Sequence, residues 1–179
     1  MLLFRQKFSI IILLLTFSLP TLAESGFAFD PSLVFGYTQD QGSYARFGLD
    51  LKYKLNDELS TGLHGYYAAG SSRPETNREI GGGWFLGYVQ PVAELIFLTL
   101  RQEINYVDQV DPKNPRLMPD GTFSYRRESG VISATSLGVH LQIENFGVSA
   151  GYRQVVGISR TELGDGRSGM FLGLGIAIF

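Results

Sequence analysis

Apolar and polar residues alternate with a period of two along most of this chain. Between residues 45 and 55, every odd position is apolar and four of the five even positions are charged. A helix would spread this pattern around its circumference, whereas a strand places each set on one face. No segment has helical periodicity, so the sequence predicts an all-β fold. The alternation recurs and predicts eight strands, near residues 27–38, 45–55, 59–67, 83–88, 98–106, 136–144, 148–153 and 170–179.

The connections between these strands alternate in length. In an up-and-down barrel, that order places every short turn at one end and every long loop at the other. The long connections contain the proline, glycine and charged residues typical of solvated loops. Tight turns are predicted at 56–58, 90–91 and 144–145, and longer connections at 39–42, 70–79, 107–130 and 159–169.

Residues 1–23 have the features of a secretory signal peptide. Arg5 and Lys7 precede an apolar stretch over residues 8–19, which a small-residue cleavage site follows. Twelve apolar-rich residues are too few to span a bilayer as a helix. We therefore expect residues 24–179 to form one exported barrel domain.

Charge and cysteine content remove several functional classes. Without the signal, 13 basic and 17 acidic residues remain, a formal charge of −4. This balance gives no basic excess to suggest a nucleic-acid partner. The chain has no cysteine, so a disulfide framework and a thiolate zinc site are excluded.

Alternation alone fits either a soluble barrel with an apolar interior or a membrane barrel with an apolar exterior. Two observations favour the membrane barrel. The less apolar faces are rich in glycine and serine, which suit the crowded lumen of an eight-stranded barrel. Aromatic residues on the apolar faces lie near strand ends, as in the aromatic girdles of membrane barrels. The predicted girdle comprises Tyr53, Tyr88, Phe146 and Phe179 near the short turns, and Tyr37, Tyr67 and Tyr106 near the long loops.

Two sequence features carry a resemblance to a known family. Phe179 closes the last apolar strand, and residues 150–153 read Ala-Gly-Tyr-Arg. Both resemble the small eight-stranded outer-membrane β-barrels of Gram-negative bacteria, the class of OmpA, OmpX and the opacity proteins. The resemblance implies an antiparallel up-and-down transmembrane β-barrel in the bacterial outer membrane, in contact with its lipid and lipopolysaccharide. It also implies that the barrel-assembly machinery recognises the C-terminal strand through Phe179.

The polar residues predicted to face the lumen form the main candidate site. Because both signs of charge are present, each buried ion can find a partner, which favours a charge-paired plug. A narrow channel through the same charges is the alternative. The predicted lumen network comprises Arg46, Asp50, Lys52, His64, Arg101, Glu103, His140, Gln142, Glu144 and Arg153.

An enzyme site in the lumen is a weaker alternative. His64 with Asp50, or His140 with Glu144, could pair a general base with a residue that orients it. No nucleophile elbow accompanies these pairs. The resembling class includes lipid A deacylases, but their His-x-Ser-Asn pattern is absent, since Gly-Tyr-Tyr follows His64 and Leu-Gln-Ile follows His140.

Two further segments suggest contacts with lipid. If Phe179 faces lipid, the alternate positions of the last strand face the lumen. Their apolar side chains would then either pack together inside the lumen or line a pocket for an acyl chain. In the mixed-charge loop 107–130, Arg126 and Arg127 could contact lipopolysaccharide phosphates, or the loop could contact a host or phage protein. The lumen-facing positions of that last strand would be Leu172, Leu174, Ile176 and Ile178.

The leading hypothesis is an integral outer-membrane barrel with a side-chain-plugged lumen. It would act in the envelope or at the cell surface through its long outer loops. The alternatives are a narrow channel and, with less support, an enzyme that modifies lipid A or phospholipid. We expect a monomer with no cofactor and no metal.

Overall fold

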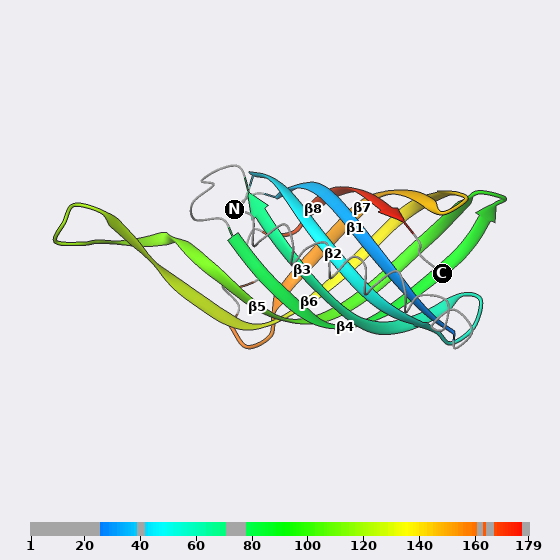
Figure 1. The fold of residues 1–179 in the computed structure, drawn as a ribbon, viewed down its shortest axis with the longest axis horizontal. Helices are drawn as coiled ribbons and strands as arrows, with labels where there is room; N and C mark the ends of the chain where they lie inside the picture. The colour runs from blue at the N-terminus through cyan, green and yellow to red at the C-terminus, as the bar shows by residue number, and fades with distance from the viewer. Residues whose placement is uncertain (1–25, 39–41, 71–77, 161–162, 164–166, 177–179) are drawn as a thin grey trace, which may run out of the picture.

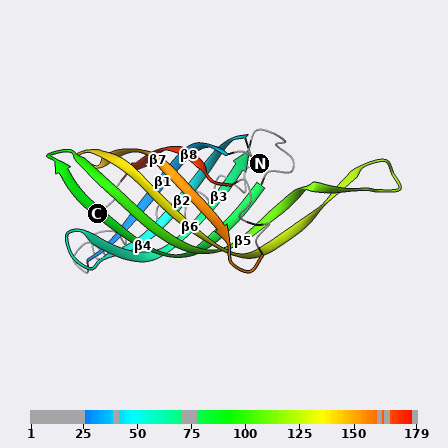
Figure 2. The same cartoon turned by 180° about the vertical axis from the view of Figure 1, so that it is seen from behind.

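A computed structural model describes residues 26–38, 42–70, 78–160, 163 and 167–176. Eight antiparallel strands close into a barrel in chain order, with β1 pairing β8 (Figures 1 and 2). This confirms the predicted fold class. The predicted signal peptide lies outside the described residues. The strands are β1 (Phe27–Thr38), β2 (Gly42–Lys54), β3 (Leu59–Gly70), β4 (Arg78–Ala93), β5 (Ile96–Leu117), β6 (Phe123–Ile143), β7 (Phe146–Gly157) and β8 (Gly169–Ile176).

The predicted turn at 90–91 is wrong. Strand β4 continues through Gln90 and Pro91, and the chain reverses at Glu94 and Leu95 instead. The pairing register of β4 with β5 shifts between Pro91 and Ala93. A bulge tolerates a proline that cannot donate to the ladder, so this proline marks a bulge rather than a turn.

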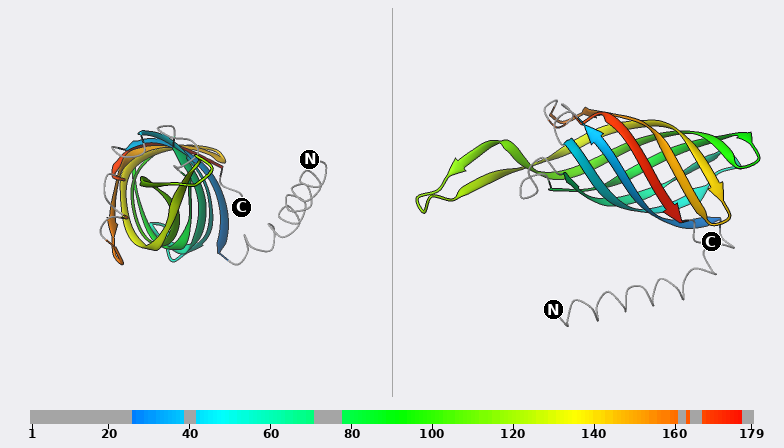
Figure 3. Two further views of the ribbon diagram at one scale, coloured as in Figure 1. Left: turned by 90° about the vertical axis from the view of Figure 1, so that its left-hand side faces the viewer. Right: turned by 90° about the horizontal axis from the view of Figure 1, so that it is seen from above.

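The predicted loop at 107–130 is also wrong, because most of it is paired strand. Beyond Gln109 and before Ile132, β5 and β6 pair with each other and not with the described parts of β4 and β7. They form a two-stranded ribbon that projects far beyond the barrel rim (Figure 3). Its prolines signalled a loop, but a register shift between Val110 and Pro115 accommodates them within the ribbon.

The barrel has a large shear, which sets its width. Following paired residues around the barrel from Thr38 leads through Gly169, Arg153, Ser136, Arg101, Gly87 and Ser60 to Lys54. The Lys54 N–H donates to the Gly26 carbonyl, so the circuit returns to the first strand at Gly26. Gly26 lies 12 residues before Thr38, where the circuit began, and the shear is therefore 12 residues. With ordinary strand spacings, this shear tilts the strands by about 46° and gives a backbone radius of about 9 Å. The lumen therefore has room for long side chains and a cavity.

The two faces of the barrel have opposite character. Large apolar side chains point outward and are exposed, including Leu63 at 61% and Trp84 at 42%. Inside, Glu103 is 2% exposed and His64 is also buried. Among the described residues, no helix is long and apolar enough to span a bilayer.

Strand β8 reverses the predicted orientation. A side chain on Gly173 would meet Ser149 and Val34, so Gly173 faces the lumen. Leu172 is 49% exposed on the outer face, and Leu174 shares its parity. The predicted apolar wedge of Leu172 and Leu174 in the lumen is therefore wrong. The prediction took its phase from Phe179, which lies outside the described residues, as does Ile178.

Candidate functional site in the barrel lumen

Glu103 on β5 is the centre of an ionic cluster across the lumen. Its Oε1 lies 2.7 Å from Arg101 Nε, and its Oε2 lies 2.7 Å from Arg153 Nη2 and 3.6 Å from Arg46 Nη2. Asn105 Nδ2 donates to the same Oε2 at 3.0 Å. Side-chain nitrogens from β2, β5 and β7 thus surround one carboxylate. Alternation along β5 places Arg101, Glu103 and Asn105 on one face.

Arg101 links Glu103 to a second acid. Its guanidinium makes a bidentate pair with Asp50 and lies 4.0 Å above the ring centre of Phe85. Its Nη2 also lies 2.6 Å from His64 Nδ1. An arginine only donates, so His64 Nδ1 accepts, and the Nε2–H donates to Asn105 Oδ1 at 2.5 Å. These partners require a neutral imidazole at His64.

A second layer lies between this cluster and the long-loop end. The guanidinium of Arg46 lies 3.8 Å from the ring centre of Tyr66, whose hydroxyl donates to Glu79. Glu79 also pairs with Arg167, which donates to the Leu163 carbonyl at 2.9 Å. Residues far apart in sequence thus join β2, β3 and β4 to the segment before β8.

An apolar group surrounds this layer, and we call it the outer seal. Leu163 is fully buried, although it lies in a connection rather than a strand. Each side chain of the outer seal is at most 7% exposed. The outer seal comprises Tyr66, Ala68, Val107, Ile132, Ala134, Val155 and Leu163.

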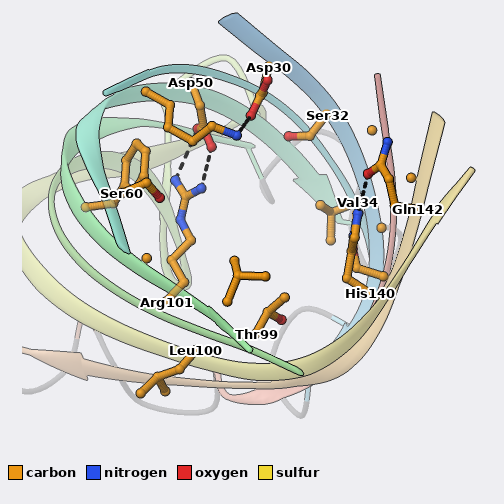
Figure 4. Close-up of a pocket in the computed structure, with 18 of the residues that line it drawn as sticks. Asp30, Ser32, Val34, Asp50, Ser60, Thr99, Leu100, Arg101, His140 and Gln142 are labelled. Carbon is orange, nitrogen blue, oxygen red and sulfur yellow. Dashed lines mark hydrogen bonds and ion pairs between the residues drawn. The ribbon is translucent and has the colours of Figure 1, made fainter. Parts of the chain in front are cut away.

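The half of the lumen nearer the short turns is less filled. It contains a cavity of about 280 Å³ that ends at Arg101 and Asp50 of the ionic cluster (Figure 4). Lys52 and Asp30 form an ion pair on its wall. On another side of the cavity, His140 Nε2 lies 2.7 Å from Gln142 Oε1 (Figure 4).

The structure places nine of the ten predicted lumen residues inside the barrel. Glu144 differs, because it is an exposed turn residue with a positive φ of 52°. Its carbonyl accepts a hydrogen bond from Gln142 Nε2 at 2.5 Å. The proposed His140–Glu144 pair is therefore not formed, and the ring nitrogens of His64 contact Arg101 and Asn105 rather than Asp50.

Sequence reasoning missed several residues of the site. Asn105 and Tyr66 were visible by their lumen parity, but neither is charged. Glu79 and Arg167 fell in predicted loops, where parity carries no information. Among the described residues, no group of three or more histidines or acids is placed to hold a metal ion.

Most of the predicted girdle residues are exposed on the outer face. Tyr88 is half-buried, and its hydroxyl lies 2.5 Å from Gln90 Oε1. Phe179 lies outside the described residues. The exposed members are Tyr37, Tyr53, Tyr67, Tyr106 and Phe146.

No protein-family model and no curated protein sequence matches this chain. Solved structures do match. The N-terminal β-barrel domain of Pseudomonas aeruginosa OprF aligns with a TM-score of 0.56 at 12% identity, over 84% of this chain and 95% of that one. Neisserial surface protein A aligns with a TM-score of 0.56 at 16% identity, over 86% and 96%. The fold is that of the small outer-membrane β-barrels. At these identities the likeness is one of fold alone.

Proposed function

We propose that this protein is an integral outer-membrane barrel whose lumen is closed by its own side chains and whose ribbon makes contacts at the cell surface. The observation that carries the proposal is the inverted polarity of the barrel. Exposed leucines and aromatic residues face outward, while Glu103 is buried inside and pairs with arginines of the lumen. In water this arrangement would expose a large apolar surface, whereas in a bilayer it places apolar groups against lipid.

A closed barrel also satisfies the backbone in lipid. All eight strands pair on both sides, so the sheet leaves no open edge within the bilayer. The two aromatic levels near the strand ends support the same orientation. The short-turn end would face the periplasm, and the ribbon would face the exterior.

The closed lumen is supported by burial at two successive levels. Glu103 and Asn105 of the ionic cluster and Val107 and Leu163 of the outer seal are each at most 2% exposed. Conduction through this lumen would require both levels to rearrange. The alternative of a narrow channel predicts ion conductance in planar bilayers that changes with Arg101→Ala, whereas a plug predicts none.

The ribbon supports a role in surface contact. Leu117 and Met118 are exposed at its tip, beside Arg116. Arg127 lies 3.4 Å from Asp108 in an exposed pair, so its charge remains accessible to a phosphate. Lipopolysaccharide phosphates are one candidate partner of Arg126 and Arg127. Shortening the ribbon to a tight turn should abolish lipopolysaccharide binding while the barrel still folds.

Trp84 provides the test of membrane insertion. It is the only tryptophan of the chain and is exposed on the outer face of β4. In folded protein reconstituted into vesicles, lipids brominated on their acyl chains should quench its fluorescence, while aqueous acrylamide should not. As a control, Trp84→Phe combined with Leu117→Trp moves the probe to the ribbon tip. That probe should respond to acrylamide and not to brominated lipid.

Two outcomes would refute the proposal. One is acrylamide quenching of Trp84 in the folded barrel without quenching by brominated lipid. The other is a freely soluble protein in the periplasm rather than one that sediments with outer membranes. Heat-modifiable migration on a gel would verify folding in each case.

A further inference from the structure

The cavity in the half of the lumen nearer the short turns has the size of a site for one small molecule. Its volume of about 280 Å³ lies just below the range of about 300–1,000 Å³ that is usual for small-molecule sites. The ionic cluster and the outer seal lie between this cavity and the long-loop end. A ligand would therefore enter from the short-turn end.

The cavity wall has unused hydrogen-bonding capacity. Four hydroxyl groups on the wall have no hydrogen-bond partner among the described residues, and their oxygens are accessible rather than enclosed by protein. Lys52 adds to this capacity, because its Nζ donates one proton to Asp30 and keeps two. A molecule inside the cavity can bond to all of these groups. The hydroxyls belong to Ser32, Ser60, Thr99 and Ser149.

Strand tilt brings the four hydroxyls to similar depths in the barrel. They come from four different strands, β1, β3, β5 and β7. The shear of 12 residues over eight strands shifts the level by about 1.5 residues per strand, so the four hydroxyls lie within about three residues, or about 7 Å, of one another in depth. Figure 4 shows Ser32, Ser60 and Thr99 on different sides of the cavity. One small molecule can therefore reach several of them.

The charges on the cavity wall are already balanced. Arg101 pairs with Asp50, and Lys52 pairs with Asp30. A charged ligand would add an uncompensated charge inside the barrel, which is unfavourable away from bulk water. An apolar ligand would leave the hydroxyls and the Lys52 protons without partners. The wall therefore fits a neutral molecule that forms many hydrogen bonds.

We propose that this cavity binds a small neutral polyhydroxyl compound, such as a monosaccharide, from the periplasm. A hydroxyl group both donates and accepts, so it can bond to a carboxylate, an ammonium or a serine on the same wall. Val34 and Val89 supply apolar surface for the carbon–hydrogen face of such a ligand. The inference rests on the proposed membrane insertion, which places the short-turn end in the periplasm. It adds a ligand to a barrel that is proposed to be closed on the other side of the cavity.

Gly175 offers a way to fill the cavity without changing its polar groups. It lines the cavity, and a Cβ at this position would lie 3.8 Å from the nearest atom, the Pro31 carbonyl oxygen. A leucine side chain there would occupy the cavity without a backbone clash. Gly175→Leu is therefore the blocking variant.

Saturation-transfer NMR tests the binding. The full chain is folded in micelles of a zwitterionic detergent without a sugar headgroup, and the probes are D-glucose, myo-inositol and glucose 6-phosphate. We expect the two neutral probes to bind, and glucose 6-phosphate to bind at least about tenfold more weakly because of its charge. Gly175→Leu should abolish binding. Ser43→Ala is the matched control, because Ser43 is exposed at the start of β2, outside the cavity, and should leave the affinity unchanged.

Variants of the cavity wall test the recognition itself. Ser32→Ala and Ser149→Ala each remove one hydroxyl and should each weaken binding of the neutral probes about fivefold, the effect of one hydrogen bond. Asp30→Asn leaves Lys52 without its carboxylate partner. Glucose 6-phosphate should therefore bind this variant about tenfold more tightly than it binds the native protein.

Three results would overturn the inference: no transfer to either neutral probe in the folded native protein, unchanged binding in folded Gly175→Leu, or equally tight binding of glucose 6-phosphate to the native protein. If Gly175→Leu does not fold, the two serine variants decide, and unchanged affinity in both overturns the inference. If Trp84 reports membrane insertion and neither neutral probe binds, only this inference fails. If the folded protein is freely soluble, the proposed function fails as well.

Discussion

Removing the charge of Glu103 is expected to destabilise the barrel more than any exposed charge change. Glu103→Gln keeps the size of the side chain but leaves Arg46 and Arg153 without their carboxylate partner. Arg101 retains Asp50. Breaking a buried ion pair by removing one partner costs about 3–5 kcal/mol, because the remaining charge is buried and uncompensated.

The Coulomb term supports this magnitude. At an effective dielectric constant of about 20, two unit charges 4 Å apart interact by about 4 kcal/mol. Glu103 faces three guanidinium groups, with N–O distances of 2.7, 2.7 and 3.6 Å. Mutual repulsion of the arginines offsets part of their attraction to Glu103, so the loss should stay near the value for a single pair.

Urea unfolding in vesicles, followed by Trp84 fluorescence, measures the effect. Asp108→Asn is the matched control, because its ion pair with Arg127 is exposed and spans 3.4 Å. Its loss should cost at most about 1 kcal/mol. If Glu103→Gln costs no more than Asp108→Asn, the arginines are solvated and the closed-lumen explanation is wrong.

Three further predictions concern packing and the ribbon. Gly83→Ala should lower the free energy of unfolding in urea by about 1–3 kcal/mol, because the added Cβ would lie 1.9 Å from a β5 carbonyl oxygen. Gly65→Ala is the control: its Cβ would lie 4.0 Å from the nearest atom, so it should leave the free energy of unfolding nearly unchanged. Leu163→Ala should lower the unfolding free energy by about 2–5 kcal/mol, since this side chain is fully buried; an unchanged urea midpoint would contradict its role in the outer seal. Hydrogen bonds from the Thr122 hydroxyl and backbone N–H hold the pKa of Asp120 below its ordinary value. The ionised carboxylate therefore stabilises the ribbon tip fully at a pH above the ordinary pKa of an aspartate. This stabilisation is lost as the pH falls through the lowered pKa of Asp120. In an NMR titration, Thr122→Val should raise the pKa of Asp120, and an unchanged pKa would refute this assignment.

The sequence predicted the barrel because alternation is a local property. Over residues 45–55 the period fixes which side chains share a face, whatever the rest of the chain does. Nine of the ten polar residues that it predicts for the lumen lie inside the barrel. Glu144 is the exception, because alternation ends where the chain enters a turn.

Features that depend on pairing between strands were decided by the tertiary structure. Pro91 indicated a turn and Pro115 indicated a loop. Instead, β4 continues through Pro91 and β5 continues through Pro115, and each proline lies beside a register shift in the ladder. The partners of Glu103 come from β2, β5 and β7, and no local pattern specifies which arginines meet there.

The sequence by itself determined that this chain forms strands with one apolar and one polar face, because a period of two admits no other regular structure. The tertiary structure decided the shear of 12 residues, which sets the lumen width and the depth of every outward residue. It also brought Gln102 into hydrogen-bonding contact with Ser133 and Thr135 on the outer face. Register is a relation between strands, so the pattern within any one strand leaves it open.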